Sequence, residues 1–254
     1  MDLATILGIL VGVSAVLTCF IMEGGHISSL FQIPAMILVV FGTIGASVAT
    51  TSIHQFMNIP KVLKVAFFEK KMNAQQLIDL ITELSQKARK NGLLSLEKEV
   101  SNINDRFLKK ALQFAIDGFE GNKIREILDI EISYMEERHK EGATFFQKMG
   151  GFSPTLGIIG TVLGLIHALG SLESSQNIAS AIASAFIATL WGVALANLLY
   201  LPLSDKLKAK HQEESLYFQI ITEGVISMVM GENPRIIRTK LYSFLLPKKR
   251  GGEE

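Results

Sequence analysis

The sequence predicts an all-α integral membrane protein with four transmembrane helices and a helical cytoplasmic domain. Hydrophobic residues make up 48% of the 254 positions and charged residues only 19%, which is too apolar for an ordinary soluble domain. Four apolar stretches contain no Asp, Glu, Lys or Arg and have about the 20 residues that cross a hydrocarbon core. All 25 Lys and Arg lie outside these stretches, 16 at positions 61–148 and 9 at positions 206–250.

The four predicted spans form two hairpins, at residues 1–53 and 149–203. A polar turn containing Gly-Gly joins the first two spans, and a turn of only a few polar residues joins the last two. Pro34 stands near the start of the second span, where a proline removes no helical hydrogen bond. The spans themselves are predicted at residues 3–22, 33–53, 149–172 and 178–203.

The basic residues predict which side of the membrane each loop occupies. Loops that carry Lys and Arg stay in the cytoplasm, and basic residues lie close to the span ends at Lys61, Lys148 and Lys206. Residues 54–148 are therefore expected to form the cytoplasmic domain, and residues 204–254 a cytoplasmic C-terminal helix and tail. With four spans, both termini are expected inside.

The segment between the hairpins is predicted to be helical. Asn73 followed by Gln76 resembles a capping box, and apolar residues then recur at helical spacing until Asn91-Gly92 interrupts the pattern. After Gly121 a longer amphipathic run continues towards the third span, with Ile124, Leu128, Ile132 and Met135 on one face. No stretch alternates as a strand would, so almost no β structure is expected.

Small residues form a stripe on each helix of the second hairpin, and each stripe includes one hydroxyl, Thr161 or Thr189. Such stripes allow another helix backbone to approach closely. Two interpretations stay open: the stripes surround a partner helix, or they hold together the helices of one copy. The small residues expected to pack are Gly157, Gly160, Gly164, Ala168, Ala185, Gly192 and Ala196.

Signatures of soluble enzymes are missing from the sequence. It has no phosphate-binding loop, no Cys/His cluster at metal-ligand spacing and no nucleophile paired with a base. We therefore expect no enzyme activity, metal, cofactor or nucleic-acid partner. The spans also contain no carboxylate, although ion carriers usually keep an ionisable group inside the membrane. Either the protein moves no ions, or a partner helix supplies the carboxylate.

Three segments resemble the A subunit of the flagellar motor stator, the MotA/PomA type. They are MGGFSPTLGIIGTVLGLI in the third span, the fourth span with Thr189 and Pro202, and GENPRIIRTKLYSFLL in the tail. The resemblance implies a bacterial inner-membrane protein in a pentameric ring around two B subunits, each carrying an ion-binding Asp and a peptidoglycan-binding domain. It also implies that inward ion flow drives torque on the rotor. The implied lining of the ion path is Pro154, Thr161, Thr189 and Pro202.

The same resemblance assigns charged residues to the flagellar rotor switch protein. The implied contacts are Arg89, Lys90, Glu97 and Glu99, with Glu131 as a further family charge position. Exposed charges give steering and register more than affinity, which suits a contact that forms and releases at each step. Ordinary solvation of a helical surface is the alternative for these side chains.

Two competing functions remain open from the sequence. An energiser of envelope transport of the ExbB/TolQ type shares the Pro-Thr-Leu-Gly segment in looser form, but that family has three spans. A membrane scaffold without an ion path would retain function when Thr189 is replaced by Val. For a stator, protons are favoured over sodium because no dedicated sodium cage is evident, although one partner Asp with Thr161 or Thr189 could still hold sodium.

Overall fold

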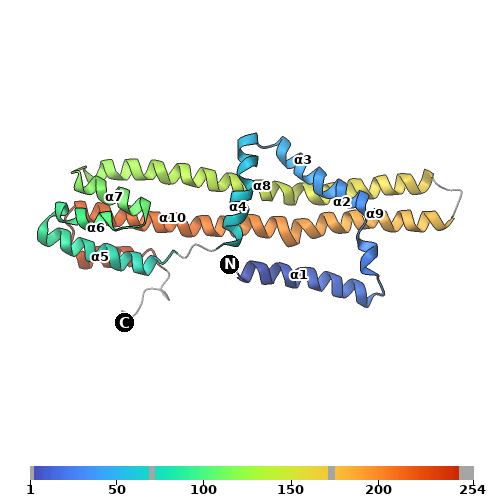
Figure 1. The fold of residues 1–254 in the computed structure, drawn as a ribbon, viewed down its shortest axis with the longest axis horizontal. Coiled ribbons are helices and arrows are strands. Elements are labelled where there is room, and N and C mark those ends of the chain that lie inside the picture. Colours follow the sequence, from blue (N-terminus) through green and yellow to red (C-terminus); the bar gives the residue numbers. More distant parts are fainter. Residues whose placement is uncertain (1–2, 69–71, 171–174, 246–254) are drawn as a thin grey trace. The chain divides into compact units, whose positions relative to one another are not determined.

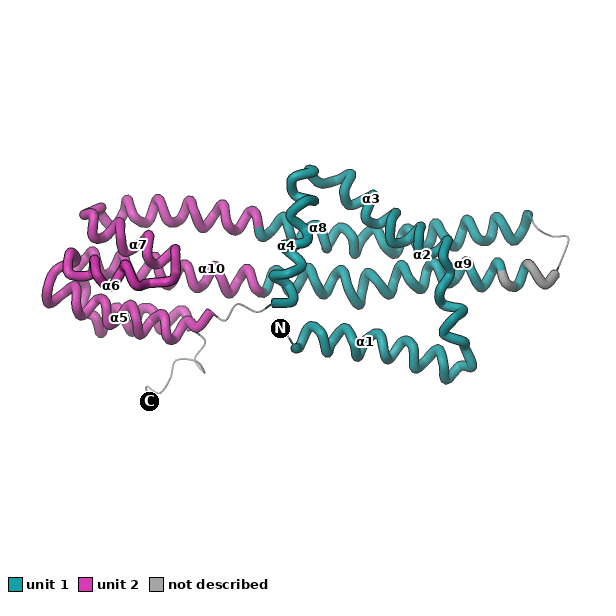
Figure 2. Tube along the Cα trace, viewed as in Figure 1, with its two compact units in different colours: residues 1–69, 139–209 teal, residues 70–138, 210–254 magenta. Residues whose placement is uncertain are grey.

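The computed structural model is all-helical over the residues it describes, which are 3–68, 72–170 and 175–245. No strand occurs among them, as the sequence predicts. Contacts divide the chain into two compact units (Figure 2): unit 1 comprises residues 1–69 and 139–209, and unit 2 comprises residues 70–138 and 210–254. Two long helices, α8 (Gly121–Gly170) and α10 (Leu201–Val229), contribute residues to both units.

Unit 1 begins with α1 (Leu3–Met22), none of whose residues is buried. The short η1 (Ile27–Leu30) leads to the second apolar segment, which consists of α2 (Ile33–Met36), the π-helical η2 (Ile37–Phe41) and α3 (Gly42–Ala49). Pro34 lies in the first turn of α2. The helix stops at Ala49, four residues before the predicted end of the span (Figure 1).

The helix that follows, α4 (Ile53–Phe67), is separate from the apolar segment before it. A complete capping box starts it: Ser52 Oγ accepts from Gln55 N–H at 3.2 Å, and Gln55 Oε1 accepts from Ser52 N–H at 3.2 Å. The sequence predicts this segment to be part of the cytoplasmic domain. In the structure it packs in unit 1, where Ile59 and Ala66 join a cluster around Phe145 and Phe146.

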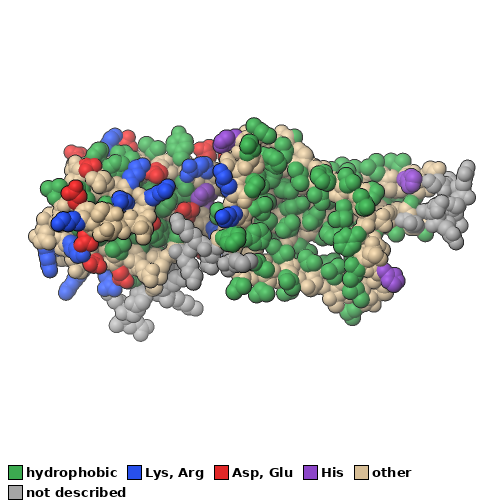
Figure 3. All heavy atoms as spheres, in the orientation of Figure 1, with side chains coloured by type: hydrophobic (Ala, Val, Ile, Leu, Met, Phe, Trp, Pro, Cys, Tyr) green, Lys and Arg blue, Asp and Glu red, His purple; other side chains and the backbone are tan. Residues whose placement is uncertain are grey.

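The last apolar helices of unit 1 are α8 and α9 (Ser175–Leu195), and the π-helical η4 (Ala196–Tyr200) connects α9 to α10. By length and composition, three helical stretches of the described residues could cross a membrane: Leu3–Met22, Gly121–Gly170 and Ala181–Val229. Ile33–Ala49 is a shorter apolar helix. Figure 3 shows hydrophobic side chains over most of the visible face of unit 1, whereas charged side chains gather over unit 2.

Unit 2 is built around its own apolar core. Besides its parts of α8 and α10, it contains α5 (Ala74–Asn91), η3 (Leu93–Leu96), α6 (Glu97–Ser101), α7 (Arg106–Ile116) and α11 (Pro234–Tyr242). The four α8 residues predicted to share a face, Ile124, Leu128, Ile132 and Met135, are all buried in this core.

The ends of α5 follow local sequence signals. Asn73 caps its first turn by accepting from the N–H groups of Gln75 and Gln76. Gly92 ends the helix with φ at +83°, a backbone conformation that glycine adopts without strain. The break predicted at Asn91-Gly92 is therefore present.

Candidate functional site

The hydroxyls of Thr161 on α8 and Thr189 on α9 contact each other directly. Thr161 Oγ1 also lies 3.2 Å from the carbonyl oxygen of Gly157 and 3.1 Å from that of Ala185. Thr189 Oγ1 lies 3.2 Å from the same Gly157 carbonyl. Two hydroxyls and two backbone oxygens thus form one cluster between the helices, and both threonines are half-buried.

This cluster has more acceptors than protons. Each hydroxyl has a single proton to donate. Both protons can be accepted within the cluster, by the carbonyls of Gly157 and Ala185 or by the neighbouring hydroxyl. The oxygens of Thr161 and Thr189 then keep lone pairs for a further donor or cation. Chemically, the pair can accept a hydrogen bond from a protonated carboxyl group or contact a small cation.

Close approach of the two helix backbones makes the contact between the hydroxyls possible. A Cβ placed on Gly157 would lie 2.9 Å from the Ala188 carbonyl oxygen and 3.0 Å from Thr189 Cα. A Cβ on Gly192 would lie 2.6 Å from the carbonyl oxygen of Ser153. The Ser153 hydroxyl donates to the Gly192 carbonyl at 2.9 Å, which ties the helices at that level.

The other small residues continue this packing along both helices. A Cβ added to Gly160 or Gly164 would come within 2.5 Å of the methyl group of Ala188 or Ala185 respectively. Ala168, Ala185 and Ala196 are almost fully buried. These contacts within a single copy occupy part of each stripe. Gly160, Gly164 and Ala185 also line an open groove of unit 1.

The two prolines of the predicted ion path lie apart from each other. Pro154 is inside α8, seven residues before Thr161, and is half-buried. Pro202 is near the start of α10 and lines a surface groove with Thr5 and Gly8 of α1. Thirteen residues separate Pro202 from Thr189, about 20 Å along a helix. The structure therefore brings Thr161 and Thr189 together but leaves Pro202 on the side of α1.

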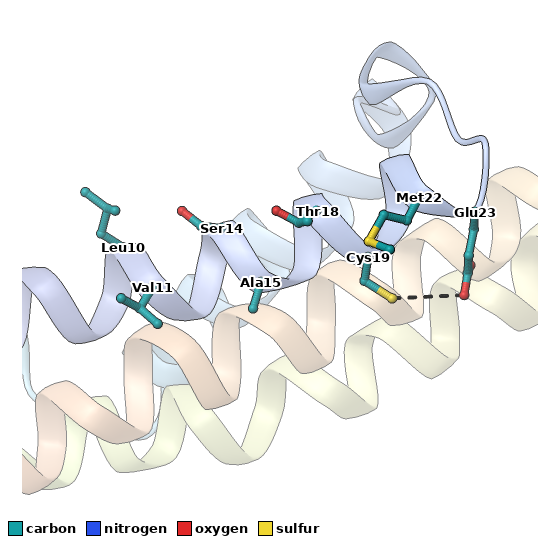
Figure 4. A pocket seen from close by; sticks show the side chains of 8 residues that line it. All are labelled: Leu10, Val11, Ser14, Ala15, Thr18, Cys19, Met22 and Glu23. Atoms are coloured by element: carbon teal, nitrogen blue, oxygen red, sulfur yellow. Dashed lines mark hydrogen bonds between the residues drawn. The ribbon is translucent and has the colours of Figure 1, made fainter.

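The described residues of unit 1 form further grooves. One groove is lined by α2, η2, α8 and α9 and contains Leu38, Gly160, Ala188 and the only ionisable group of its lining, His167. Another lies along α1 (Figure 4) and is lined by seven of its side chains, from Leu10 to Met22, and by Glu23, which follows the helix. Cys19 Sγ lies 4.0 Å from Glu23 Oε1. In the described part of the chain no group of His, Cys, Asp and Glu could hold a metal ion.

The predicted rotor contacts lie in unit 2, on either side of the break between α5 and α6. Arg89 and Lys90 are in the last turn of α5, Glu97 and Glu99 are in α6, and all four are exposed. Glu99 differs from the others because it accepts from Lys87 Nζ at 2.9 Å. Its hydrogen bond and that of Glu83 raise the pKa of Lys87.

The remaining family charge position, Glu131, is engaged in an ion pair within unit 2. Its carboxylate lies 2.7 Å from Lys110 Nζ. Arg89, Lys90 and Glu97 have no such partner among the described residues, so their charged groups are available to another protein. Local sequence spacing does not predict the ion pairs of Glu99 and Glu131, because their lysines are 12 and 21 residues away in the chain.

Comparison with known proteins identifies the family of this chain. Residues 99–220 match the MotA/TolQ/ExbB proton channel family, and residues 6–92 match the motility protein A N-terminal family. Motility protein A of Bacillus subtilis is 35% identical over 98% of this chain and 93% of its own length. Chemotaxis protein PomA of Vibrio alginolyticus is 33% identical over 100% of this chain and 99% of its own.

Solved structures agree over the whole length. The structure of C. jejuni MotAB matches with a TM-score of 0.95 and 32% identity, and covers 100% of both chains. The flagellar MotAB stator complex from Bacillus subtilis matches with a TM-score of 0.91 and 35% identity over 96% of each chain. The full-length likeness includes the first two apolar segments as well as the hydroxyl-bearing helix pair. The chain belongs to the MotA/PomA family of flagellar stator subunits.

Proposed function

We propose that this chain, together with a B subunit anchored to peptidoglycan, forms an ion channel that couples inward ion flow to torque on the flagellar rotor. The observation that carries the proposal is the full-length similarity to chains of MotAB stator complexes. Energy would come from the membrane potential, which supplies about 2.3 kcal/mol per elementary charge and 100 mV.

The proposed topology has four spans in the bacterial inner membrane with both termini in the cytoplasm. Three helical stretches are long and apolar enough to cross, and Ile33–Ala49 is the proposed fourth span. Seventeen residues reach about 25 Å at 1.5 Å per residue, which a short span can accommodate by local thinning of the bilayer. Unit 2, with its charged surface, would then be the cytoplasmic domain.

The proposed ion path needs a carboxylate from the B subunit. The described residues of the third and fourth apolar segments contain no Asp, Glu, Lys or Arg, whereas Thr161 and Thr189 offer oxygen lone pairs. An Asp of the partner helix, when protonated, could donate to this pair, and the pair could also contact sodium. Pro154 would line the same path, and Pro202 would lie at its cytoplasmic end. Protons are the preferred ion, as no further oxygen ligand from the described side chains joins the cluster.

The proposed assembly is a ring of five copies. Support for oligomerisation comes from α1, because none of its residues is buried within one chain although the helix is strongly apolar. Neighbouring copies and lipid would cover it. The cytoplasmic domain would contact the rotor switch protein through Arg89, Lys90, Glu97 and Glu99.

The decisive experiment is deletion of the gene in its own host. We expect cells with complete flagella, visible by electron microscopy, that do not swim, and recovery of swimming when the wild-type gene is returned. Normal swimming in a host without a second stator gene would contradict a motor function. A defect in energised uptake across the outer membrane, with normal swimming, would favour the ExbB/TolQ type of function.

A further inference from the structure

Helix α4 has two different faces. Figures 1 and 2 show it crossing the parts of α8 and α10 that belong to unit 1 at a steep angle. Its inner face packs on those helices: the rings of Phe56 and Phe145 are 6.2 Å apart, and Ile59 and Ala66 are buried. Val62 lies against Gly142, where an added Cβ would be 3.0 Å from the valine methyl group.

The outer face of α4 mixes large apolar side chains with amines. Met57, Lys61 and Lys64 fall within a sector of about 60° at 100° per residue, and all three are exposed. The apolar side chains that are more than half exposed in or next to the helix are Ile53 (70%), Met57 (72%), Val65 (54%) and Phe68 (53%).

No carboxylate of the described residues compensates the charge of this face. No Asp or Glu occurs between Glu23 and Glu69 in the sequence. Neither Lys61 nor Lys64 forms an ion pair with a described residue, and Lys61 Nζ has only Asn58 Oδ1 at 3.5 Å. Lys148, whose Nζ donates to the Thr50 carbonyl at 2.8 Å, brings a third positive charge to the turn just before α4.

This combination fits a lipid surface better than a second copy of the chain. The cores of protein interfaces are depleted in charged residues, and unit 1 of another copy would offer few carboxylates, with none at positions 24–68 or 149–172. Helices that lie in the membrane interface, by contrast, combine Lys on a polar side with apolar residues that enter the acyl region. Three residues separate the end of the apolar α3 from the start of α4, which suits that position.

We propose that α4 is a membrane-interface helix whose outer face binds anionic phospholipid. Lys61 and Lys64 pair with headgroup phosphates, while Ile53, Met57, Val65 and Phe68 enter the acyl chains beside them. Because the inner face of α4 packs on Phe145 and Phe146, bound lipid stabilises this cluster of unit 1. The proposal does not depend on torque generation.

The test uses the full chain with its B partner, reconstituted into bilayer discs of phosphatidylcholine alone or with added phosphatidylglycerol. The measured quantity is the shift of the thermal unfolding midpoint that phosphatidylglycerol causes. We compare wild type with the double variant Lys61→Gln/Lys64→Gln. The matched control is Lys98→Gln/Lys109→Gln, which removes two exposed amines from unit 2.

We expect phosphatidylglycerol to raise the midpoint of wild type and control but not of the α4 variant. Binding of each retained headgroup should weaken about fivefold per lysine removed. Soluble glycerophosphoglycerol, which lacks acyl chains, should cause no shift. An unchanged shift in the α4 variant would overturn the proposal. So would a photo-crosslinker at Met57 that captures a second copy of the chain instead of lipid.

Discussion

At the scale of single residues, the informative feature is that Thr161 and Thr189 share one carbonyl acceptor and contact each other. Each hydroxyl proton has an acceptor within the chain, so the pair holds its orientation without any ligand. The Ser153 hydroxyl, which donates to the Gly192 carbonyl, resembles them in bridging the helices but is fully buried. Thr161 and Thr189, by contrast, bridge the helices while remaining half-buried.

We predict that Thr189→Val abolishes swimming while leaving the protein folded and in the membrane. Valine has nearly the shape of threonine but cannot donate or accept a hydrogen bond, so only the polar contact is lost. Swimming speed and membrane abundance are the measurements. Thr189→Ser, which restores the hydroxyl, should recover part of the speed.

The control for this variant is Thr155→Val. Thr155 is exposed and its hydroxyl donates to the Phe152 carbonyl of the same helix at 2.7 Å. It should swim at the wild-type speed. If Thr189→Val swims as well as Thr155→Val, the hydroxyl pair has no part in ion movement and a scaffold role becomes the better hypothesis.

At the scale of helices, α8 and α9 approach so closely that a methyl group at the contact has no room. We predict that Gly157→Ala destabilises unit 1 by about 1–3 kcal/mol, the usual effect of overpacking, because the new Cβ would meet the Ala188 carbonyl and Thr189 Cα. Gly151→Ala in the same helix should be neutral or stabilising by up to about 1 kcal/mol, since nothing lies within 4 Å of its Cβ. Thermal unfolding midpoints in detergent would distinguish them, and equal midpoints would contradict the packing.

In unit 2, Glu223 ties three helices together. It accepts from Arg125 of α8 at 2.7 Å and pairs with Lys240 of α11. Burial opposes ionisation of Glu223, but the hydrogen bonds of Lys240 and Arg125 outweigh it and lower the pKa of the carboxyl group below its ordinary value of 4.5. The same contact with Glu223 raises the pKa of Lys240 above 10.5.

The expected pH dependence follows from these directions. A carboxylate with a lowered pKa stabilises the fold above pH 4.5, and this contribution is lost as the pH falls through the folded-state value. Glu223→Gln should therefore cost about 2 kcal/mol at neutral pH, and its difference from wild type should shrink on acidification below pH 4.5. Unfolding midpoints at pH 7 and pH 4 measure this. A difference that stays constant would show that the ion pairs contribute little.

The helices that the sequence predicts well are those with long periodic patterns. The buried face of α8 is predictable because four apolar residues, Ile124, Leu128, Ile132 and Met135, recur at helical spacing. The capping box at Ser52 and Gln55 is equally readable but follows an apolar run directly, so the end of α3 and the start of α4 merge into one pattern. The Thr161–Thr189 contact depends on how α8 and α9 are rotated about their own axes relative to each other. The spacing of residues within each helix does not determine that rotation.

At the scale of the whole molecule, charge and apolar surface are divided between the two units. Unit 1 carries the hydroxyl pair and the apolar helices, and unit 2 carries the exposed charges at the end of α5 and in α6. The sequence predicts this division because the basic residues fall in two blocks. The ion pairs of Glu99 and Glu131 are unpredictable from it, since they depend on how distant helices meet.

Because the two sets of residues lie in different units, the proposed rotor contact can be removed without removing ion conductance. We predict that Arg89→Glu stops swimming while membrane abundance, assembly with the B subunit and ion conductance of the complex stay at the wild-type level. Arg89 is exposed and has no ion pair among the described residues, so reversing its charge should change only an intermolecular contact. Arg138→Glu, which reverses an exposed charge on α8 of unit 2, is the control and should swim normally. Loss of conductance in Arg89→Glu would mean that this charge acts on the channel, and a rotor contact would then no longer explain the loss of swimming.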